Sequence, residues 1–383
     1  MKCLLVVPRW SELESFMPPS GRPHLDLLLE TFGFVELGIR ELEKGEPFDP
    51  TEVDEEYKLI LIQGRNRPGG GRLRRSVLSS LGLSLGLDGD ESDRLRVVGA
   101  RPLYNSEGHP AGFAIKRRGR MVTYFQESIW SLRGELVGAL HAMRRDEGQS
   151  ARRGAGRPGS CWMIEGAGDP LDLSRYMGEE ERSQCTVRNL PDGDAALFMP
   201  ALMGDEFKRR VQNRLGSRMY STEPRPLEDL VGERLRESGV RVVVSESCTG
   251  GLVTARISAM PGCSDYLSSG YVTYSDQAKF RCLEVPPVLL ERCGAVSPEV
   301  ALAMARGALR AAGSDLAISV TGIAGPAGGS DEKPVGTVYL AAVSRDGGAL
   351  EHHGFYNGDR DRIRFQSSQT ALHLLRRMLV DQG

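Results

Sequence analysis

The chain has 383 residues, enough for two or three domains of roughly 150 residues each. It carries 49 Lys and Arg against 51 Asp and Glu, and this balance argues against a protein that mainly coats nucleic acid. The hydrophobic fraction of 40% and the charged fraction of 26% are typical of a folded globular chain. No apolar run reaches the roughly 18 residues of a membrane helix. The seven cysteines form no CxxC pair and the six histidines no HExxH motif, so we expect free thiols in a reducing cytoplasm and no metal site.

The first 145 residues alternate strand and helix signals, which is typical of a layered α/β domain. We predict strands over 2–7, 34–39, 57–63, 112–116 and 120–125, and helices over 24–32, 72–81 and 127–143. Residues 144–159 are rich in Arg, Gly and Ser without apolar periodicity, so they are predicted to form a linker. Residues 160–222 form a small mixed segment, with strands predicted over 184–188 and 195–199 and a helix over 204–215.

From residue 224 onward the periodic signals become sharper. We predict helices over 227–238, 251–259, 297–312 and 359–379, and strands over 240–245, 269–274, 316–321, 336–343 and 350–356. Four polar turns follow strands of this set. Ligands of open α/β sheets bind at such edges, where strand ends and helix N-termini leave N–H groups free to meet an anion.

The first two turns offer hydroxyl groups. Residues 245–251 read SESCTGG, where serine or threonine hydroxyls and two glycines either admit a ligand or simply cap the following helix. In the second turn, 261–266 (PGCSDY), Ser264 is either an exposed nucleophile or an ordinary turn serine. Cys263 is the competing nucleophile there, provided that its pKa falls.

The third and fourth turns offer an amine and a long loop. Only seven of the 49 basic residues are lysine, so Lys279 at a strand-to-helix junction is a candidate base as well as a candidate surface lysine. The loop that begins at Thr321 is long and rich in Gly and Pro, as functional or disordered loops are. Arg360 precedes the last helix and can pair with phosphate or carboxylate.

Taken together, these segments resemble the C-terminal domain of the CinA family, with its PncC-type nicotinamide mononucleotide (NMN) deamidases. The matching segments are SESCTGG (245–251), PGCSDY (261–266), VTYSDQAK (272–279), GAVSPEV (294–300), VTGIAGPAGGSDEKPVGTV (320–338) and GDRDRIR (358–364). The resemblance implies an α/β sandwich and an amidohydrolase of pyridine-nucleotide salvage. Such an enzyme hydrolyses the carboxamide of NMN to nicotinate mononucleotide and ammonia without a cofactor.

The resemblance also implies roles for individual residues. Ser264 would be the nucleophile, Lys279 would take its proton, and Tyr274 would orient or relay that proton, as in Ser–Lys variants of hydroxyl activation. The substrate pocket would be lined by Ser247, Thr249, Gly250, Gly251, Thr321, Gly322 and Arg360.

Full-length members of the family carry two further parts, so the resemblance implies three domains. Residues 1–145 would be a degenerate molybdopterin-binding-like α/β/α domain, 146–222 a linker and small KH-like α+β connector, and 223–383 the amidohydrolase. In the first domain the loop 63–68 and the segment 124–128 depart from the family pattern. We therefore expect it to serve folding, dimerisation or regulation.

Two alternatives to the amidohydrolase remain at this point. One is a divalent-metal-dependent ADP-ribose pyrophosphatase in the first domain. The other is a non-catalytic competence- or damage-related interaction protein. For the leading interpretation we expect a nucleotide substrate, a cytoplasmic homodimer, and no nucleic-acid or membrane partner.

Overall fold

The structure is a computed structural model, and it describes most of the chain. The described residues are 1–8, 25, 27–29, 34, 36–43, 46–63, 70–88, 91–104, 110–125, 160–166, 171–200, 203–260 and 262–380. The predicted helix 127–143, the linker 144–159 and the loop 64–68 lie outside these residues, so the expectations that rest on them stay predictions. The chain divides into two compact units, Met1–Ser160 with Pro200–Leu202, and Cys161–Met199 with Met203–Gly383.

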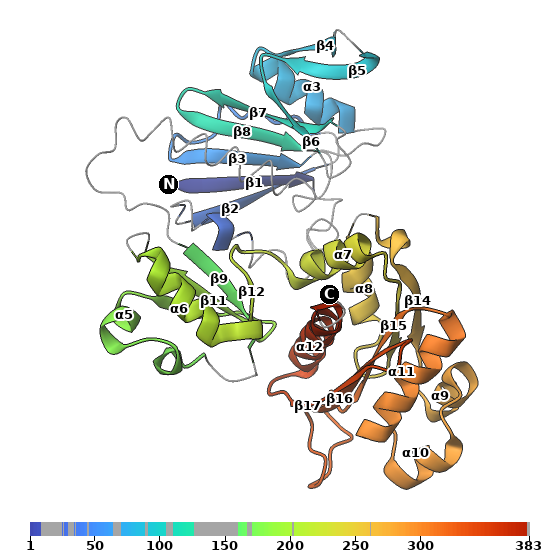
Figure 1. Ribbon diagram of the computed structural model, residues 1–383. Coiled ribbons are helices and arrows are strands. Elements are labelled where there is room, and N and C mark those ends of the chain that lie inside the picture. Colours follow the sequence, from blue (N-terminus) through green and yellow to red (C-terminus); the bar gives the residue numbers. More distant parts are fainter. Residues whose placement is uncertain are drawn as a thin grey trace. The chain divides into compact units, whose positions relative to one another are not determined.

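The first unit is built on a six-stranded sheet with the order β2-β1-β3-β8-β7-β6 (Figure 1). Strands β2, β1, β3 and β8 are parallel, and β7 and β6 continue the sheet in antiparallel register. A helix, α3 (Gly70–Ser80), and a small antiparallel hairpin of β4 (Ser84–Asp88) and β5 (Glu91–Val98) complete the described part. The sheet strands are β1 (Lys2–Pro8), β2 (Glu36–Leu42), β3 (Tyr57–Gln63), β6 (Arg101–Tyr104), β7 (Pro110–Arg117) and β8 (Arg120–Phe125).

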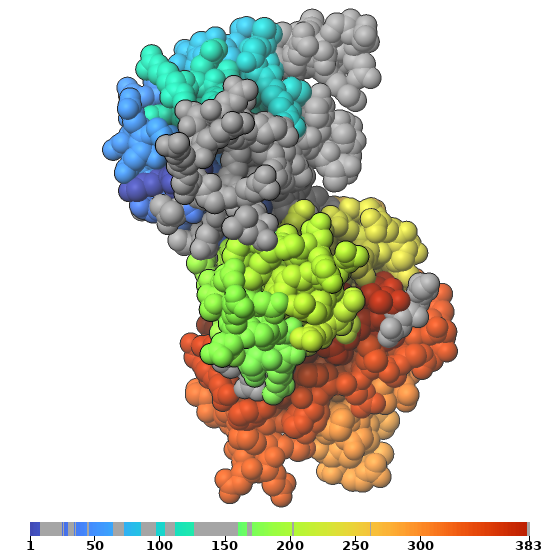
Figure 2. All heavy atoms as spheres, turned by 60° about the vertical axis from the view of Figure 1, so that its left-hand side comes forward, coloured from blue at the N-terminus to red at the C-terminus, as the bar shows by residue number. Residues whose placement is uncertain are grey.

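The second unit begins with a small α+β segment, here called the connector (residues 160–222). It has a four-stranded sheet with the order β10-β11-β9-β12. Its strands are β9 (Ser160–Ile164), β10 (Thr186–Asn189), β11 (Ala195–Met199) and β12 (Met219–Ser221), and its helices are α5 (Glu179–Ser183) and α6 (Asp205–Leu215). The connector packs with the C-terminal domain as one unit, and Figure 2 shows its green surface against the red C-terminal segment.

The C-terminal domain is an α/β sandwich around a five-stranded sheet with the order β14-β13-β15-β16-β17. The first three strands are parallel and the last two antiparallel. Helices α7, α8 and α12 pack on one side, and α9, α10 and α11 on the other (Figure 1). The strands are β13 (Val242–Glu246), β14 (Leu267–Val272), β15 (Leu316–Gly322), β16 (Thr337–Ser344) and β17 (Ala349–Phe355), and the helices α7 (Leu227–Ser238), α8 (Leu252–Ser258), α9 (Asp276–Leu283), α10 (Pro287–Cys293), α11 (Pro298–Ala312) and α12 (Arg360–Val380).

Local sequence explains these elements. All five residues of β13 (VVVSE) are buried, as expected for a central strand covered on both faces. Helix α7 ends at Gly239, which adopts the left-handed conformation (φ 66°) that favours glycine. Helix α11 begins after Ser297, whose hydroxyl accepts a hydrogen bond from the Val300 N–H, and Pro298 occupies its first turn. No helix in the described part of the chain has the length and apolarity to cross a membrane.

A buried ion pair fastens three helices of the sandwich to one another. Arg256 of α8 and Glu228 of α7 are joined at 2.8 Å with fully buried side chains. The Arg256 guanidinium also donates to Ser368 Oγ (2.8 Å) and to Gln369 Oε1 on α12. The low dielectric constant of this site makes an unpaired charge there very unfavourable.

We therefore expect Arg256→Met to lower the free energy of unfolding in urea by about 3–5 kcal/mol, because it removes the positive charge that pairs with the buried Glu228 carboxylate. Adding Glu228→Gln should restore part of that loss. The exposed pair Arg310–Glu284 provides the control, since Arg310→Met should cost no more than about 1 kcal/mol. A loss for Arg256→Met as small as that of the control would contradict this interpretation of the ion pair.

Candidate active site

The carboxyl ends of the three parallel strands converge at one edge of the sandwich sheet. Main-chain bonds hold this edge together, because Ser247 N donates to Val320 O (2.9 Å) and Thr273 N donates to Glu246 O (2.8 Å). The turns that follow strands β13, β14 and β15 therefore lie side by side. Three of the four polar turns predicted from the sequence meet here.

A lysine and a serine form a buried pair at this edge. Lys279, from the first turns of α9, is 1% exposed and Ser247 is 8% exposed. The Lys279 Nζ lies 3.2 Å from Ser247 Oγ, 3.0 Å from the Thr273 carbonyl oxygen and 3.4 Å from the Tyr274 carbonyl oxygen. Burial lowers the pKa of Lys279, and the nearby Asp276 opposes this effect.

This geometry allows the amine to exchange a proton with the serine. The two carbonyl oxygens take two N–H groups of the amine in either protonation state. The third position faces Ser247 Oγ, where an ammonium group presents a donor and a neutral amine presents its lone pair. Lowering the pKa of Lys279 increases the fraction of neutral amine, which is the form that can accept the serine proton.

The turn after β13 is held by a buried carboxylate. Glu246 is fully buried, and its carboxylate oxygens accept hydrogen bonds from the N–H groups of Gly251 (3.0 Å), Val253 (3.1 Å) and Thr254 (2.9 Å) and from the Thr254 hydroxyl (2.7 Å). The N-terminus of α8 is therefore occupied by a protein carboxylate. This corrects the expectation that its N–H groups are free to meet an anionic ligand.

The glycines and the threonine of this turn have distinct roles. Gly250 and Gly251 adopt φ values of 60° and 97°, a region that favours glycine. The Thr249 carbonyl oxygen accepts two hydrogen bonds from the Arg364 guanidinium, at 3.0 and 3.3 Å. The buried Thr249 Oγ1 has no hydrogen-bond partner among the described residues, so it is an unused donor two residues along the chain from Ser247.

Tyr274 and Arg360 form the exposed part of the site. The Arg360 guanidinium donates to the Tyr274 hydroxyl (2.8 Å) and to the Gly325 carbonyl oxygen (2.6 Å). The Tyr274 side chain is 59% exposed, and this residue reaches Lys279 through its main-chain oxygen. The structure thus joins the Tyr274 hydroxyl to Arg360, which does not support the predicted role of that hydroxyl as a proton relay for Lys279.

The long loop after β15 is anchored at several points. The Thr321 hydroxyl donates to the Ala295 carbonyl oxygen (2.8 Å). Lys333 donates to the Cys293 (3.1 Å) and Val296 (2.8 Å) carbonyl oxygens. At Gly322 an added Cβ would lie 2.6 Å from the Val338 side chain, so close packing between β15 and β16 is the reason for this glycine. Thr321 and Gly322 therefore shape the loop that borders the site.

The structure does not bring Ser264 to this site, which corrects the predicted nucleophile. Ser264 lies in a short 3-10 helix (Cys263–Asp265) before β14, next to the amino end of β13, where Val242 N donates to Tyr266 O. Lys279 lies beyond the carboxyl end of β14, whose six residues span about 20 Å at roughly 3.3 Å each. Ser264 and Lys279 are thus at opposite ends of the strand.

Cysteine does not replace serine at either turn. Cys248 is 4% exposed, and burial raises the pKa of its thiol to about 12, so the thiol stays protonated and unreactive at neutral pH. Cys263 lies beside Ser264, away from Lys279. Within the described ranges, no three His, Cys, Asp or Glu side chains are grouped to hold a metal ion.

Sequence reasoning gave no role to three residues that shape the site. Glu246 fixes the turn of Ser247, Arg364 holds the Thr249 carbonyl, and Lys333 anchors the long loop. The role of Glu246 could have been predicted from the sequence. A buried carboxylate at the end of a strand needs hydrogen-bond donors, and the N-terminus of the next helix provides N–H groups for it.

Comparison with known proteins identifies the family of the C-terminal domain. Residues 224–379 match the family model of the CinA C-terminal domain. A CinA-like protein of Citrifermentans bemidjiense is 52% identical over 170 residues, which are 44% of this chain and 41% of that protein. A competence-damage inducible protein of Moorella thermoacetica is 48% identical over 299 residues, which are 74% of this chain and 70% of that protein.

Among solved structures, the competence/damage inducible protein CihA of Agrobacterium tumefaciens is 40% identical, with a TM-score of 0.40. The match covers 42% of this chain and 99% of that one. The matched region spans only about 41% of the length of the first CinA-like relatives. The extended match to the Moorella thermoacetica protein and the matching C-terminal domain together show that the chain belongs to the CinA family.

Proposed function

We propose that the C-terminal domain is an amidohydrolase that converts NMN to nicotinate mononucleotide and ammonia, with Ser247 as nucleophile and Lys279 as base. The observation that carries the proposal is the 3.2 Å contact between Ser247 Oγ and the buried Lys279 Nζ. The CinA family resemblance of the surrounding motifs suggests the amide substrate. Ser247 takes the place that the sequence assigned to Ser264.

The proposed reaction needs only groups that are present in this turn and its neighbours. Ser247 Oγ attacks the carboxamide carbon while its proton passes to neutral Lys279, and the C–N bond then breaks as Lys279 returns the proton to the departing ammonia. Water then attacks the ester, gives a proton to Lys279, and the nicotinate mononucleotide leaves as Ser247 recovers a proton. We assign the unused Thr249 hydroxyl as a donor to the oxygen that becomes negative during each attack.

The test of this function is the release of ammonia from NMN by the full chain in the presence of EDTA. Nicotinate mononucleotide should appear in equal amount, and chromatography would measure it alongside a coupled ammonia assay. Absence of both products under conditions in which the protein is folded would contradict the proposal. Formation of AMP and ribose 5-phosphate from ADP-ribose, measured by chromatography with added divalent metal, would instead support the alternative activity of the first domain.

Arg360 is expected to bind the substrate phosphate. Its guanidinium is held by the Tyr274 hydroxyl and the Gly325 carbonyl. Within the described chain no carboxylate lies at ion-pair distance from it, so its charge is available to an anion. Arg360→Gln should therefore raise KM for NMN by about 10-fold or more, since a charged hydrogen bond contributes roughly 1.5–3 kcal/mol, with a much smaller change in kcat.

Steady-state kinetics of ammonia release would measure this effect, and Arg362→Gln is the matched control, because Arg362 is an exposed arginine two residues along the same helix. Equal KM values for Arg360→Gln and Arg362→Gln would contradict the assignment of Arg360 to the phosphate.

A further inference from the structure

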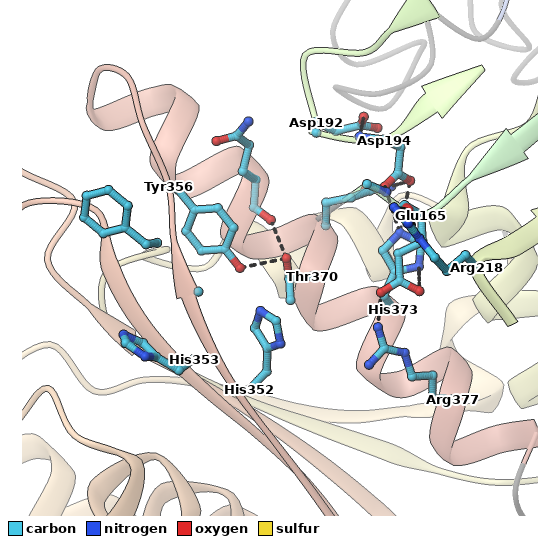
Figure 3. A pocket seen from close by; sticks show the side chains of 16 residues that line it. Glu165, Asp192, Asp194, Arg218, His352, His353, Tyr356, Thr370, His373 and Arg377 are labelled. Carbon is cyan, nitrogen blue, oxygen red and sulfur yellow. Dashed lines mark hydrogen bonds and ion pairs between the residues drawn. The ribbon is translucent and has the colours of Figure 1, made fainter. Parts of the chain in front are cut away.

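A cavity lies away from the proposed active site, between the connector and the sandwich (Figure 3). It has a volume of about 370 Å³, near the lower end of the range that holds small organic ligands. The walls come from the end of β9, the turn between β10 and β11, the segment before β12, strand β17 and helix α12. None of Ser247, Lys279, Tyr274 and Arg360 lines it. We call it the seam cavity.

The carboxylates of the seam cavity are buried and already bonded. Asp194 is 1% exposed and accepts hydrogen bonds from His373 Nε2 (3.0 Å), Gln369 Nε2 (2.6 Å) and the Gly166 N–H (3.1 Å). Glu165 is 8% exposed and pairs with Arg376 (2.8 Å) and with Arg377.

The remaining carboxyl group, Asp192, is mostly uncharged near neutral pH. It is 3% exposed, and burial, together with the neighbouring Asp194, raises its pKa to about 8. The acidic residues therefore contribute little free negative charge to the space of the cavity.

The partly exposed wall of the seam cavity instead offers one arginine without a carboxylate partner among the described residues, and further hydrogen-bond donors. Arg218 is half-buried, and its guanidinium donates to the Glu165 main-chain oxygen (3.0 and 3.2 Å) and to the Tyr176 hydroxyl (2.8 Å). No carboxylate of the described chain lies within ion-pair distance of it. Across the cavity in Figure 3 lie His352 and His353 of β17. Burial lowers the pKa of His352, the nearby Arg377 lowers it further, and Glu165 opposes this effect, so His352 faces the cavity as a neutral imidazole that can donate one hydrogen bond.

His373, which also lines the seam cavity, has a buried ring nitrogen without a hydrogen-bond partner among the described residues. The side chain of His373 is 2% exposed, and its Nδ1 has no hydrogen-bond partner in the described part of the chain. Its Nε2 is fully used by Asp194. The Nδ1 atom lies 3.7 Å from Glu165 Oε2, so the imidazole is placed between the carboxylates of Asp194 and Glu165.

We propose that the seam cavity binds a small organic anion whose carboxylate or phosphate group is held by Arg218 and His352. Such a ligand contacts both the connector and the sandwich, so its binding stabilises their packing. This inference does not depend on the proposed amidohydrolase activity.

The test is calorimetric titration of the full chain with benzoate, phenyl phosphate and inorganic phosphate, with neutral benzamide as the comparison. At about 10 mM ligand even a site with a Kd of roughly 1 mM is nearly full. We expect at least one anion to bind and benzamide not to bind. Stronger binding of benzoate identifies a carboxylate site, and stronger binding of the two phosphates identifies a phosphate site.

Variants locate the binding. Arg218→Gln should weaken it by about 10-fold or more. His352→Phe should weaken anion binding several-fold. This variant replaces Arg218→Gln as the test if Arg218→Gln fails to fold. The exposed Arg310→Gln and the active-site variant Lys279→Met should leave the affinity unchanged. Failure of all three anions to bind, equal binding of benzamide, or unchanged affinity in His352→Phe would overturn the proposal.

Discussion

Replacing Ser247 with alanine is expected to reduce ammonia release from NMN by at least about 10³-fold, the scale seen when a nucleophile that works with its base is removed. The reason is geometric, because Ser247 Oγ is the hydroxyl that lies 3.2 Å from Lys279 Nζ. The fold should survive, since the Ser247 contacts that hold the turn are made by its main chain. Initial rates of ammonia formation, with circular dichroism as a check on folding, measure the effect.

The matched control is Ser264→Ala. Ser264 is exposed and lies before β14, far from Lys279, so its loss should change the rate by less than about three-fold, as expected for a residue outside the reacting unit. The reverse result, with activity lost in Ser264→Ala and kept in Ser247→Ala, would restore the nucleophile that the sequence suggested.

Replacing Lys279 with methionine is expected to lower kcat by about 10²–10⁴-fold, the usual contribution of a general base. Lys279→Arg should not restore the rate, because a guanidinium stays charged and cannot accept the serine proton. Lys208→Met on α6 of the connector provides a lysine control with unchanged kcat. A Lys279→Arg variant with near-normal kcat would contradict the role of Lys279 as base.

The pH dependence follows from the same lysine. Burial lowers the pKa of Lys279, and its neutral form is the reactive one, so kcat of the unchanged chain should rise with pH and level off once the amine has lost its proton. That rise should begin below the ordinary titration range of lysine. In Lys279→Met the rising limb should disappear, whereas a merely structural lysine would leave the shape of the profile intact.

The sequence predicted most elements of the C-terminal domain because their signals are local. The buried run before the SESCTGG turn became β13, and Pro298 and Ser297 marked the start of α11. Lys279 stood out because lysine is rare in this chain, and the structure places it in the buried pair. Family membership, which the order of the motifs predicted, is confirmed by the family model and by the extended match to a relative.

The choice between two serines could not be made from the sequence. The strand predicted over 269–274 lies between Ser264 and Lys279, but only the parallel pairing of β13 with β14 shows that Ser247, at the end of β13, lies at the same sheet end as Lys279. The hydrogen bonds from the α8 N-terminus to Glu246 likewise form only where the end of β13 lies close to that helix.

The seam cavity illustrates a second limit of sequence analysis. Asp194 and His373 are 179 residues apart in the chain, yet they are joined at 3.0 Å. Neither residue belongs to a motif, and each one alone resembles an ordinary buried polar residue. Contacts of this kind arise from the packing of the connector against α12, which no local pattern encodes.

The central claim is that Ser247 and Lys279 act as one unit, and a double-mutant cycle on NMN hydrolysis tests it most directly. The account predicts that Ser247→Ala/Lys279→Met releases ammonia no more slowly than the slower single variant, because residues that act together are not additive. Losses that multiply in the double variant would show that the two side chains act independently, and would contradict the account.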